Sequence, residues 1–399
     1  MTAPLAGIRV VELASFVAVP AAGALLADLG ADVIKIEIPT GEYYRTATPR
    51  RLGFPDSTFP LAAHFHMDNR GKRSLALDLN RPGAPEAVRR LVDRSDLLLT
   101  NMLPQRLERF GLDPQQLRAA RPELICAALS GYGRQGEDAN RPGFDFAAFW
   151  ARSGFMDLAH DAGQSPSYLR PGAGDHPAAL ALVTGILAAL RVRDQTGVGQ
   201  EVEVSLLHTG LYVMANDTNQ TLVTRKQMPR HDRHAPRNPL WNHYPTKDER
   251  WLFLVMIESE RYWPGFCRAL ERPDLAADPR FADVVQRYRN NRALVETLDG
   301  IFTSRTLDDW RRTLDAKAVI WSPVQTLEEV IHDPQTRANG SFVTVDHPVA
   351  GPFETLAPPV RLSDHEMLGN RPAPELGAHS REILREAGLS ESEISALLE

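Results

Sequence analysis

Short runs of apolar residues alternate with amphipathic segments over the first 130 residues of the chain. The apolar runs are rich in branched side chains and predict strands at residues 8–13, 32–38, 75–79, 96–100 and 124–129. Two amphipathic segments predict helices, one at residues 20–29 with Gly30 at its end and one at residues 84–94. Strands that alternate with helices in this way predict a parallel sheet with helices on both faces.

The pattern changes in the middle of the chain. Residues 177–193 are apolar on nearly every side of a helix, which predicts a buried helix rather than a surface one. Residues 201–207 alternate glutamate with valine and predict a half-exposed strand. Residues 225–245 are rich in arginine, proline and histidine, which indicates a linker or crossing segment. Residues 251–257 predict a further strand, and residues 258–325 are expected to be mainly helical.

The last part of the chain predicts a helix after Thr326 and short strands at residues 342–345 and 360–362. Ser390 and Glu393 have the spacing of a capping box, which predicts the start of the final helix.

Composition narrows the class of protein. The 399 residues are 43% hydrophobic and 24% charged, which is ordinary for a globular protein of two or three domains and excludes disorder. The net charge of −6 offers no basic field to nucleic acid. The only cysteines are Cys126 and Cys267, which excludes a disulfide scaffold. The nearest candidate for a membrane span, residues 13–26, is short and interrupted by Pro20, so we expect a soluble cytoplasmic protein.

Common cofactor motifs do not occur in the sequence. The loop after the first predicted strand, residues 14–20, lacks the G-x-G-x-x-G pattern of a dinucleotide site, although Glu37 has the place of a ribose ligand. A P-loop is also missing. His231, His234 and His243 lie in an arginine-rich segment, which opposes a bound dication. We therefore expect no metal and no permanently bound cofactor.

Two polar stretches are candidates for chemistry. Residues 69–74, N-R-G-K-R-S, fit either a phosphate-binding cluster or a solvated turn. Residues 172–177, G-A-G-D-H-P, place Asp175 between a glycine-rich turn and the apolar helix. Asp175 is either a plain helix cap or an ionised carboxylate at the positive end of the helix, with glycines that let a bulky substrate approach. The pattern alone favours the cap.

Stretches along nearly the whole chain, taken together, resemble the class III CoA-transferase family, the group of formyl-CoA transferase and carnitine CoA-transferase. The matching blocks are residues 4–13, 29–37, 69–79, 101–112, 131–145, 174–190 and 242–251. Seven blocks in the same order are more specific than any one of them, and they favour Asp175 as the catalytic nucleophile over the plain cap.

The resemblance implies covalent chemistry at Asp175. Its carboxylate attacks an acyl-CoA thioester to give a mixed anhydride, and the CoA thiolate returns to give an aspartyl-CoA thioester. The acceptor carboxylate then attacks this thioester, and CoA moves to the acceptor acid. Such a reaction requires an acyl-CoA and a free carboxylic acid, with neither metal nor ATP.

The resemblance also implies CoA contacts, position by position. They are Ser15, Phe16, Val17 and Ala18 in the first loop, the basic residues Lys72, Arg73 and Arg109, and further Asn101, Met102 and Arg141. The formyl-CoA member closes a glycine-rich loop over its intermediate. Residues 231–239 have no such run, so the family's means of protecting the intermediate has no counterpart there.

The expected architecture also follows from the resemblance. It is an α/β fold with a Rossmann-like parallel sheet in a large domain built from both chain ends, residues 1–224 and 326–399. Residues 225–325 are expected to form a linker and a smaller α+β domain, and two subunits are expected to interlock as a homodimer.

A 2-methylacyl-CoA racemase on the same scaffold is the main alternative, and a non-enzymatic CoA-binding protein is a further one. A racemase needs acid and base groups beside the α-carbon of its substrate. The racemase pattern has histidine where this chain has Phe144, and a phenylalanine side chain cannot accept or donate a proton. The sequence therefore favours the transferase, and leaves the donor and acceptor unidentified.

Overall fold

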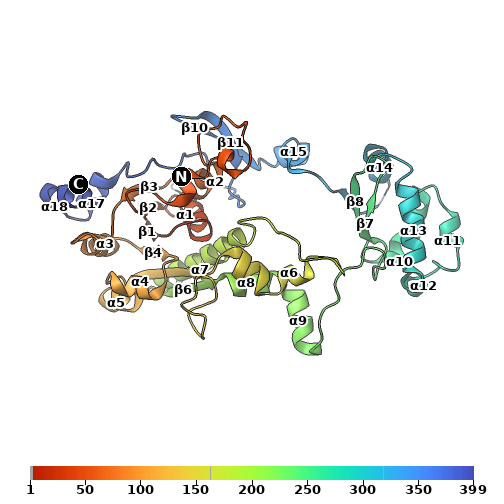
Figure 1. The fold of residues 1–399 in the computed structure, drawn as a ribbon, viewed down its shortest axis with the longest axis horizontal. Coiled ribbons are helices and arrows are strands. Elements are labelled where there is room, and N and C mark those ends of the chain that lie inside the picture. Colours follow the sequence, from red (N-terminus) through yellow and green to blue (C-terminus); the bar gives the residue numbers. More distant parts are fainter. Residues whose placement is uncertain (1–2, 162, 318) are drawn as a thin grey trace. The chain divides into compact units, whose positions relative to one another are not determined.

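The computed structural model describes residues 3–161, 163–317 and 319–399. The chain forms two compact units (Figure 1). The first comprises Met1–Met156, Tyr168–Lys226 and Arg337–Glu399, and the second comprises Asp157–Ser167 and Gln227–Thr336. The expected domains stay a prediction. The compact units differ from them in two places, because residues 157–167 group with the second unit and the chain returns to the first unit at residue 337.

A six-stranded sheet forms the centre of the first unit, with the order β3-β2-β1-β4-β5-β6. Its strands are β1 (Arg9–Leu13), β2 (Asp32–Glu37), β3 (Arg73–Ala76), β4 (Leu97–Thr100), β5 (Ile125–Ser130) and β6 (Glu201–Ser205). Every neighbouring pair is parallel. The predicted α/β class with a parallel sheet is therefore confirmed.

Helices cover both faces of this sheet because alternate side chains of each strand point to opposite sides. On one side, Val10 and Leu97 pack against α1 (Ala18–Asp28) and α7 (Asp175–Thr196). On the other side, Val11 and Leu98 belong to the core of α3 (Ala84–Val92), α17 (Ser380–Glu386) and α18 (Glu391–Leu398). Helix α17, the last helix but one and blue in Figure 1, packs against β3 and α3.

Helix α7 differs from its prediction as a wholly buried helix. One side of α7 packs against α1 and the sheet through Leu182, Ile186 and other residues that are fully buried. The other side exposes Leu180 by 42% and Leu187 by 40%. By length and composition alone, α7 is long and apolar enough to cross a membrane. Its packing on the sheet instead makes it a core helix of this unit, with an apolar outer side.

The second unit contains a three-stranded antiparallel sheet of β7 (Trp241–Pro245), β8 (Trp251–Val255) and β9 (Trp321–Pro323). Helices fill the chain between β8 and β9, as predicted: α10 (Ser259–Ala269), α11 (Asp274–Ala277), α12 (Val284–Arg289), α13 (Asn291–Phe302) and α14 (Leu307–Asp315). Their apolar sides enclose a core that includes Tyr244, Phe302 and Trp310.

The remaining elements are mostly short connections. They are η1 (Tyr43–Thr46), η2 (Pro49–Leu52), α2 (Ala63–Asn69), α4 (Pro104–Arg109), α5 (Pro114–Ala120), η3 (Phe146–Ala151), α6 (Phe155–Leu158), α8 (Leu206–Val213), α9 (Ala215–Thr224), α15 (Leu327–Val330), α16 (Pro334–Ala338), β10 (Phe342–His347) and β11 (Gly351–Leu356).

The predicted strand at residues 360–362 is wrong. The partner of β10 is β11, and Leu362 makes only an isolated bridge to His365. The predicted capping box of α18 is confirmed. The Ser390 hydroxyl accepts the Glu393 N–H, and the Glu393 carboxylate accepts the Ser390 N–H at 2.7 Å.

Candidate active site

The strand order creates a crevice at the carboxyl edge of the sheet, because the chain reverses its winding direction between β1 and β4. The loops that follow these two strands meet there. The Asn101 amide donates to the Ser15 carbonyl at 2.8 Å, and its oxygen accepts the Ser15 N–H at 3.3 Å. The structure thus brings together the predicted residues Ser15 to Ala18 with Asn101 and the neighbouring Met102.

Phe16 has an unusual backbone conformation in this loop. Its φ of 67° lies in the left-handed region, which is costly for a residue with a bulky side chain. The Phe16 N–H donates to the Glu42 carboxylate at 2.6 Å, which holds this conformation. The Phe16 ring is 38% exposed and meets Phe144 edge-on at 5.2 Å between centroids. The following residues, Val17 and Ala18, are buried at the start of α1.

Asp175 lies at the same edge, because α7 connects β5 to the parallel strand β6 and must begin where β5 ends. The predicted glycine-rich turn precedes it. Gly172 has a φ of 79° and donates its N–H to the Asp145 carboxylate at 2.8 Å. A Cβ atom on Gly174 would lie 2.6 Å from the Phe149 ring, so only glycine fits there. Asp175 is the first residue of α7, one position after the N-cap.

The environment of Asp175 disfavours its charge. Burial and the nearby carboxylates of Asp145 and Asp68 raise the pKa of Asp175 to about 7, although His176 acts in the opposite direction. Burial and like charges therefore oppose the helix N-terminus, which favours the ionised form of Asp175. Burial is the main cause that raises the pKa of Tyr44, and the charges of Asp68, Asp175 and Asp145 raise it further.

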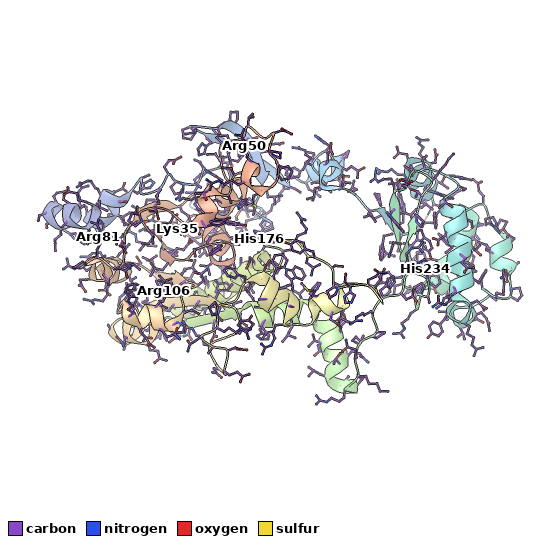
Figure 2. All side chains as sticks on the ribbon, viewed as in Figure 1. Lys35, Arg50, Arg81, Arg106, His176 and His234 are labelled. Carbon is purple, nitrogen blue, oxygen red and sulfur yellow. The ribbon has the colours of Figure 1, made fainter. Side chains whose placement is uncertain are left out.

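His176 connects this site to α2 and was missed by the sequence reasoning. Its Nε2 lies 3.2 Å from Asp68 Oδ1, and its Nδ1 lies 2.8 Å from the Gly172 carbonyl oxygen (labelled in Figure 2). Asp68 is 2% exposed. Asp68 and His176 are 108 positions apart, so no motif connects them. We call Asp68, Asp145, Asp175 and His176 the acidic cluster.

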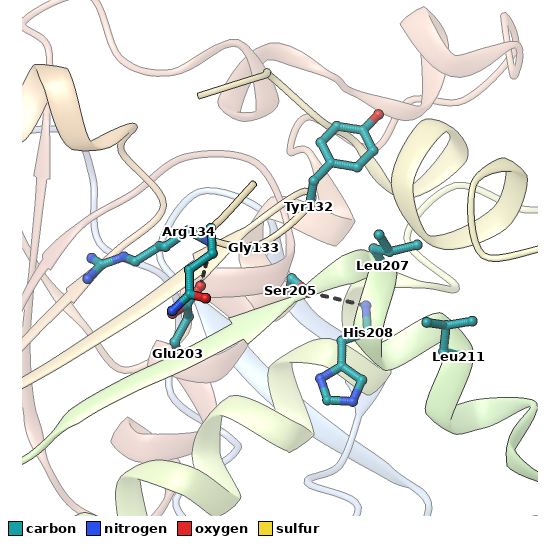
Figure 3. A pocket seen from close by; sticks show the side chains of 9 residues that line it. Tyr132, Gly133, Arg134, Glu203, Ser205, Leu207, His208 and Leu211 are labelled. Atoms are coloured by element: carbon teal, nitrogen blue, oxygen red, sulfur yellow. Dashed lines mark hydrogen bonds between the residues drawn. The ribbon is translucent and has the colours of Figure 1, made fainter. Parts of the chain in front are cut away.

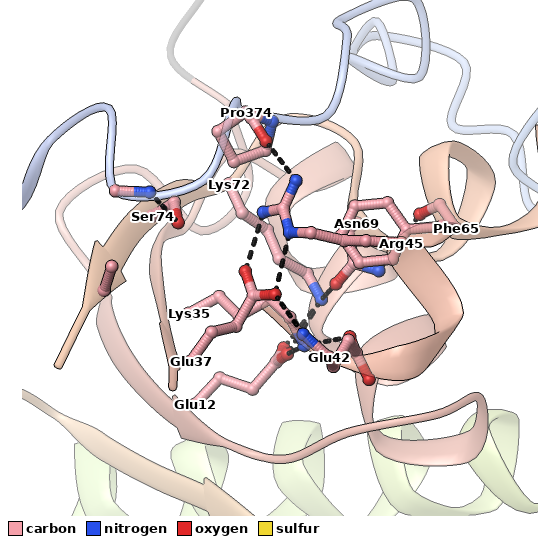
Figure 4. Close-up of polar contacts among 12 residues, drawn as sticks. Glu12, Lys35, Glu37, Glu42, Arg45, Phe65, Asn69, Lys72, Ser74 and Pro374 are labelled. Atoms are coloured by element: carbon pink, nitrogen blue, oxygen red, sulfur yellow. Dashed lines mark hydrogen bonds and ion pairs between the residues drawn. The ribbon is translucent and has the colours of Figure 1, made fainter. Parts of the chain in front are cut away.

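Lys72 lies inside a set of paired charges that we call the ionic cluster (Figure 4). Its members are Glu12, Lys35, Glu37, Glu42, Arg45 and Lys72. The Lys72 ammonium donates to Glu12, to the Pro20 carbonyl and to Asn69 at 2.9–3.0 Å. Its three N–H groups are thus in use and the side chain is fully buried, so its position does not support a contact with a CoA phosphate.

The other predicted basic residues differ in accessibility. Arg73 makes paired hydrogen bonds to Asp32 and to Glu386, which ties β3 to α17. Arg109, at the end of α4, is exposed and donates to Asn80 at 2.9 Å. Arg141 is exposed as well, with its guanidinium 5.5 Å from the centre of the Tyr132 ring. Arg109 and Arg141 therefore keep donors free for an anion, whereas the donors of Arg73 are occupied.

A separate open cavity of about 410 Å³ lies at the ends of β5 and β6 (Figure 3). Its lining mixes polar and apolar side chains, from Tyr132, Gly133, Arg134, Gln135, Glu203, Ser205, Leu207, His208 and Leu211. Glu203 accepts the main-chain N–H of Arg134 at 2.6 Å, whereas the Arg134 guanidinium pairs with Glu201 at 3.3 Å.

The histidines of the second unit do not form a metal site in the described residues. His231 makes a hydrogen bond of 3.0 Å with Asn242, and its ring lies 5.8 Å from that of His243. Across the described ranges, no group of three or more histidine, cysteine, aspartate or glutamate side chains could hold a metal ion.

Comparisons with known proteins agree on one family. The model of CoA-transferase family III matches residues 5–380. The chain is 32% identical to the (R)-2-hydroxy-4-methylpentanoate CoA-transferase of Clostridioides difficile, over 98% of this chain and 97% of that protein. It is 32% identical to the succinate–glutarate CoA-transferase of Agrobacterium fabrum, over 96% and 95%. A crystal structure of a CAIB/BAIF family protein from Brucella suis superposes with a TM-score of 0.84 at 31% identity, over 97% and 100% of the two chains.

Proposed function

Because the chain belongs to CoA-transferase family III, we propose that it transfers CoA from an acyl-CoA to a free carboxylic acid through covalent intermediates on Asp175. One observation carries this assignment. Asp145 accepts a hydrogen bond from Gly172 and Asp68 binds His176, whereas the Asp175 carboxylate has no hydrogen-bond partner among the described residues. A carboxylate left free at a crevice beside a glycine turn is suited to attack a substrate.

The reaction consists of acyl exchanges in which each bond formed replaces one broken. An Asp175 oxygen bonds to the thioester carbon, and the C–S bond breaks to release CoA thiolate. The thiolate attacks the Asp175 carbonyl carbon of the anhydride and releases the donor acid as a carboxylate. The acceptor carboxylate then attacks the aspartyl-CoA thioester and releases CoA thiolate, which leaves an anhydride between Asp175 and the acceptor. The thiolate attacks the acceptor carbonyl carbon of this anhydride, so that the acceptor becomes the acyl-CoA and Asp175 is freed as a carboxylate. Main-chain N–H groups at the start of α7 are candidates to stabilise each oxyanion.

The assignment is tested with Asp175→Asn. We expect this variant to lose turnover by at least about a thousandfold, because an amide cannot form the anhydride. With acyl-CoA alone, the wild type is expected to gain a CoA adduct on the peptide that contains Asp175, cleavable by hydroxylamine. Asp194→Asn, the same change at the exposed end of α7, serves as the control. Wild-type turnover in Asp175→Asn, or an adduct on another peptide, would reject the mechanism.

The acid substrate is proposed to carry an apolar body. Phe16 and Phe144, which are 38% and 57% exposed, meet beside the turn that holds Asp175. The relatives include a cinnamoyl-CoA:phenyllactate CoA-transferase of Clostridium sporogenes, 30% identical over 98% of this chain and 95% of that protein. A screen of carboxylic acids against acetyl-CoA and succinyl-CoA, with mass spectrometry of the CoA products, identifies the pair. Preference for small dicarboxylic acids would contradict the proposal.

We also propose a cytoplasmic homodimer that buries the outer side of α7 and neighbouring helices. Exposed apolar residues lie on α7, on α8 and on α9: Leu180, Leu187, Val192, Tyr212, Val213, Leu222 and Val223. An apolar surface of this kind is typical of a subunit interface. Light scattering is expected to give twice the chain mass, and a monomer at micromolar concentration would contradict the proposal.

The racemase alternative is not favoured, because the related proteins are CoA-transferases and Phe144 offers no proton. Incubation with a 2-methylacyl-CoA in deuterated water, without an acceptor, is expected to leave the α-carbon undeuterated.

A further inference from the structure

The contacts of His176 determine its protonation state. Both ring nitrogens lie within hydrogen-bond distance of an oxygen that can only accept: Gly172 O at 2.8 Å and Asp68 Oδ1 at 3.2 Å. A neutral imidazole has one N–H and satisfies one such acceptor, whereas an imidazolium satisfies both. The geometry therefore favours the charged form, and the hydrogen bond that the His176 ring donates to Asp68 is the main cause that raises the pKa of His176.

The charge of His176 has no substitute in the acidic cluster. The titratable groups that face Asp175 are Asp145 from the preceding turn, Asp68 from α2 and Tyr44 from η1. His64, on α2 beside Tyr44, has a pKa lowered by burial and stays neutral at pH 7. His176 is thus the cation hydrogen-bonded within this cluster. The Lys72 ammonium also interacts electrostatically with Asp68, but its hydrogen bonds go to Glu12, Asn69 and the Pro20 carbonyl. The cations of the ionic cluster are already paired with Glu12, Glu37 and Glu42.

The same contacts fix the main chain before Asp175. Asp145 accepts the Gly172 N–H. The Gly172 carbonyl accepts the main-chain N–H of His176 at 3.1 Å and is also contacted by the His176 ring, so both polar groups of this glycine are held. Asp68 in turn lies on α2, which packs against α1. The turn that sets the direction of the Asp175 side chain is therefore attached to the sheet-covering helices.

We propose that His176 is a positioning residue for the nucleophile: as an imidazolium held between Asp68 and the Gly172 carbonyl, it fixes the turn before α7 and supplies the positive charge that allows Asp175 to react as a carboxylate. This proposal rests on the proposed function of Asp175. It makes the reaction depend on a histidine–aspartate pair in which neither residue attacks the substrate.

The first test measures the charge of His176 without any reaction. In the unliganded full-length protein labelled with ¹⁵N-histidine, both ring nitrogens of His176 are expected to carry protons at pH 7. Its signal, assigned by its loss in His176→Gln, is expected to titrate at higher pH than free histidine. Asp68→Asn is expected to lower this midpoint. A neutral His176 at pH 7 overturns the proposal, whatever the protein catalyses.

The second test separates a positioning role from a merely structural one. Glutamine retains hydrogen bonding but carries no charge. His176→Gln is therefore expected to form the acyl-CoA adduct about tenfold more slowly than wild type at pH 6–7, and at a similar rate above pH 9. The matched control is His208→Gln, at an exposed position of α8. A loss that is equal at every pH, or no loss at all, overturns the proposal.

The two tests also separate this inference from the proposed function. If wild-type protein forms no adduct on Asp175, the proposed function fails and the NMR measurement still decides the charge of His176. If the adduct forms and His176→Gln behaves as wild type at every pH, only the role of His176 fails.

Discussion

The first unit contains two groups of buried charged residues, which differ in how far their carboxylates are balanced by cations. The ionic cluster under α1 combines the carboxylates of Glu12, Glu37 and Glu42 with the cations of Lys35, Arg45 and Lys72, each within an ion pair. The acidic cluster at the start of α7 combines the carboxylates of Asp68, Asp145 and Asp175 with one imidazolium. The first cluster is balanced and the second carries excess negative charge.

The direction in which the pKa of each buried carboxylate is shifted depends on this balance of charge. Burial alone would raise the pKa of Glu37, but its hydrogen bond to Arg45 and the charge of Lys35 lower it. At Asp175, burial and like charges act together and raise the pKa to about 7. Burial is common to both clusters, so the difference comes from the partners. A buried carboxylate whose carboxylate neighbours outnumber its one cation is unfavourable for folding, which indicates a functional role rather than a structural one.

Glu42 connects the two clusters. One of its oxygens lies 2.9 Å from the Lys35 ammonium, and the other accepts the Phe16 N–H at 2.6 Å. The ionic cluster therefore holds the loop of Phe16, which borders the acidic cluster. The comparison predicts opposite consequences when a charge is removed from each cluster.

The largest effect is expected for Glu12→Gln in the ionic cluster. The change leaves Lys72 buried without a carboxylate, and removing one partner of a buried ion pair costs about 3–5 kcal/mol. We expect a loss of this size in the free energy of unfolding, measured by urea denaturation. The control is Glu86→Gln, which breaks exposed pairs with Arg89 and Arg90 on α3 and is expected to cost less than about 1 kcal/mol. Equal effects of the two variants would contradict the distinction.

The opposite sign is expected for Asp175→Asn, which removes a charge that the fold disfavours. The pKa of Asp175 is about 7 in the folded protein against an ordinary value of 3.8. Wild-type stability from this group is therefore complete below about pH 4 and is lost as the pH rises through 7. At pH 8 the variant is expected to be more stable than wild type by about 2–4 kcal/mol. At pH 4 the two proteins are expected to unfold alike, and a variant less stable than wild type at pH 8 would contradict the assignment.

The sequence was sufficient to predict the sheet because its central strands are buried on both faces, while β6 shows the alternation of a half-exposed strand. Strands such as β4 are continuous apolar runs, which stand out from their surroundings. Strand β11 was missed because its residues alternate between half-buried and exposed and include Pro352 and Glu354. The same local pattern in a loop would look no different.

The candidate site was only partly predictable, since its decisive contacts join distant segments. Asp175 was singled out by a local motif, and the resemblance of seven blocks to one family made it the candidate nucleophile. Asp68 and His176 carry no local signal, because they meet only when α2 and α7 pack in the fold. The buried position of Lys72 was not foreseen for the same reason. A stretch with three cations in four residues resembles a solvated surface, and its partner Glu12 lies 60 positions away.

The charge imbalance predicts a pH dependence of the first chemical step. Only ionised Asp175 attacks the thioester, and with a pKa of about 7 its ionised fraction rises from about 9% at pH 6 to about 91% at pH 8. We expect the rate of adduct formation at low acyl-CoA concentration to rise about tenfold over this interval. A rate that is constant between pH 6 and 8 would show that the neighbouring carboxylates do not control Asp175.

The smallest effects are expected on CoA affinity, which tests whether the ionic cluster takes part in CoA binding. Arg109 is exposed, so its guanidinium is free to reach a CoA phosphate, whereas the ammonium of Lys72 is fully committed inside the ionic cluster. Arg109→Ala is expected to weaken CoA binding about tenfold, because a charge-assisted hydrogen bond contributes about 1.5–3 kcal/mol. Lys72→Met is expected to lower stability and to leave the CoA affinity of the folded protein unchanged. Both affinities are measured by calorimetry at a temperature where each variant is folded.

Arg106→Ala, at another exposed position of α4, is the matched control for a general loss of positive charge on this helix. If Arg106→Ala and Arg109→Ala weaken binding equally, the effect belongs to the overall charge of the helix rather than to a contact. If Lys72→Met weakens CoA binding as strongly as Arg109→Ala while remaining folded, the ionic cluster must open when CoA binds. Lys72 would then take part in CoA binding, and the ionic cluster would not be purely structural.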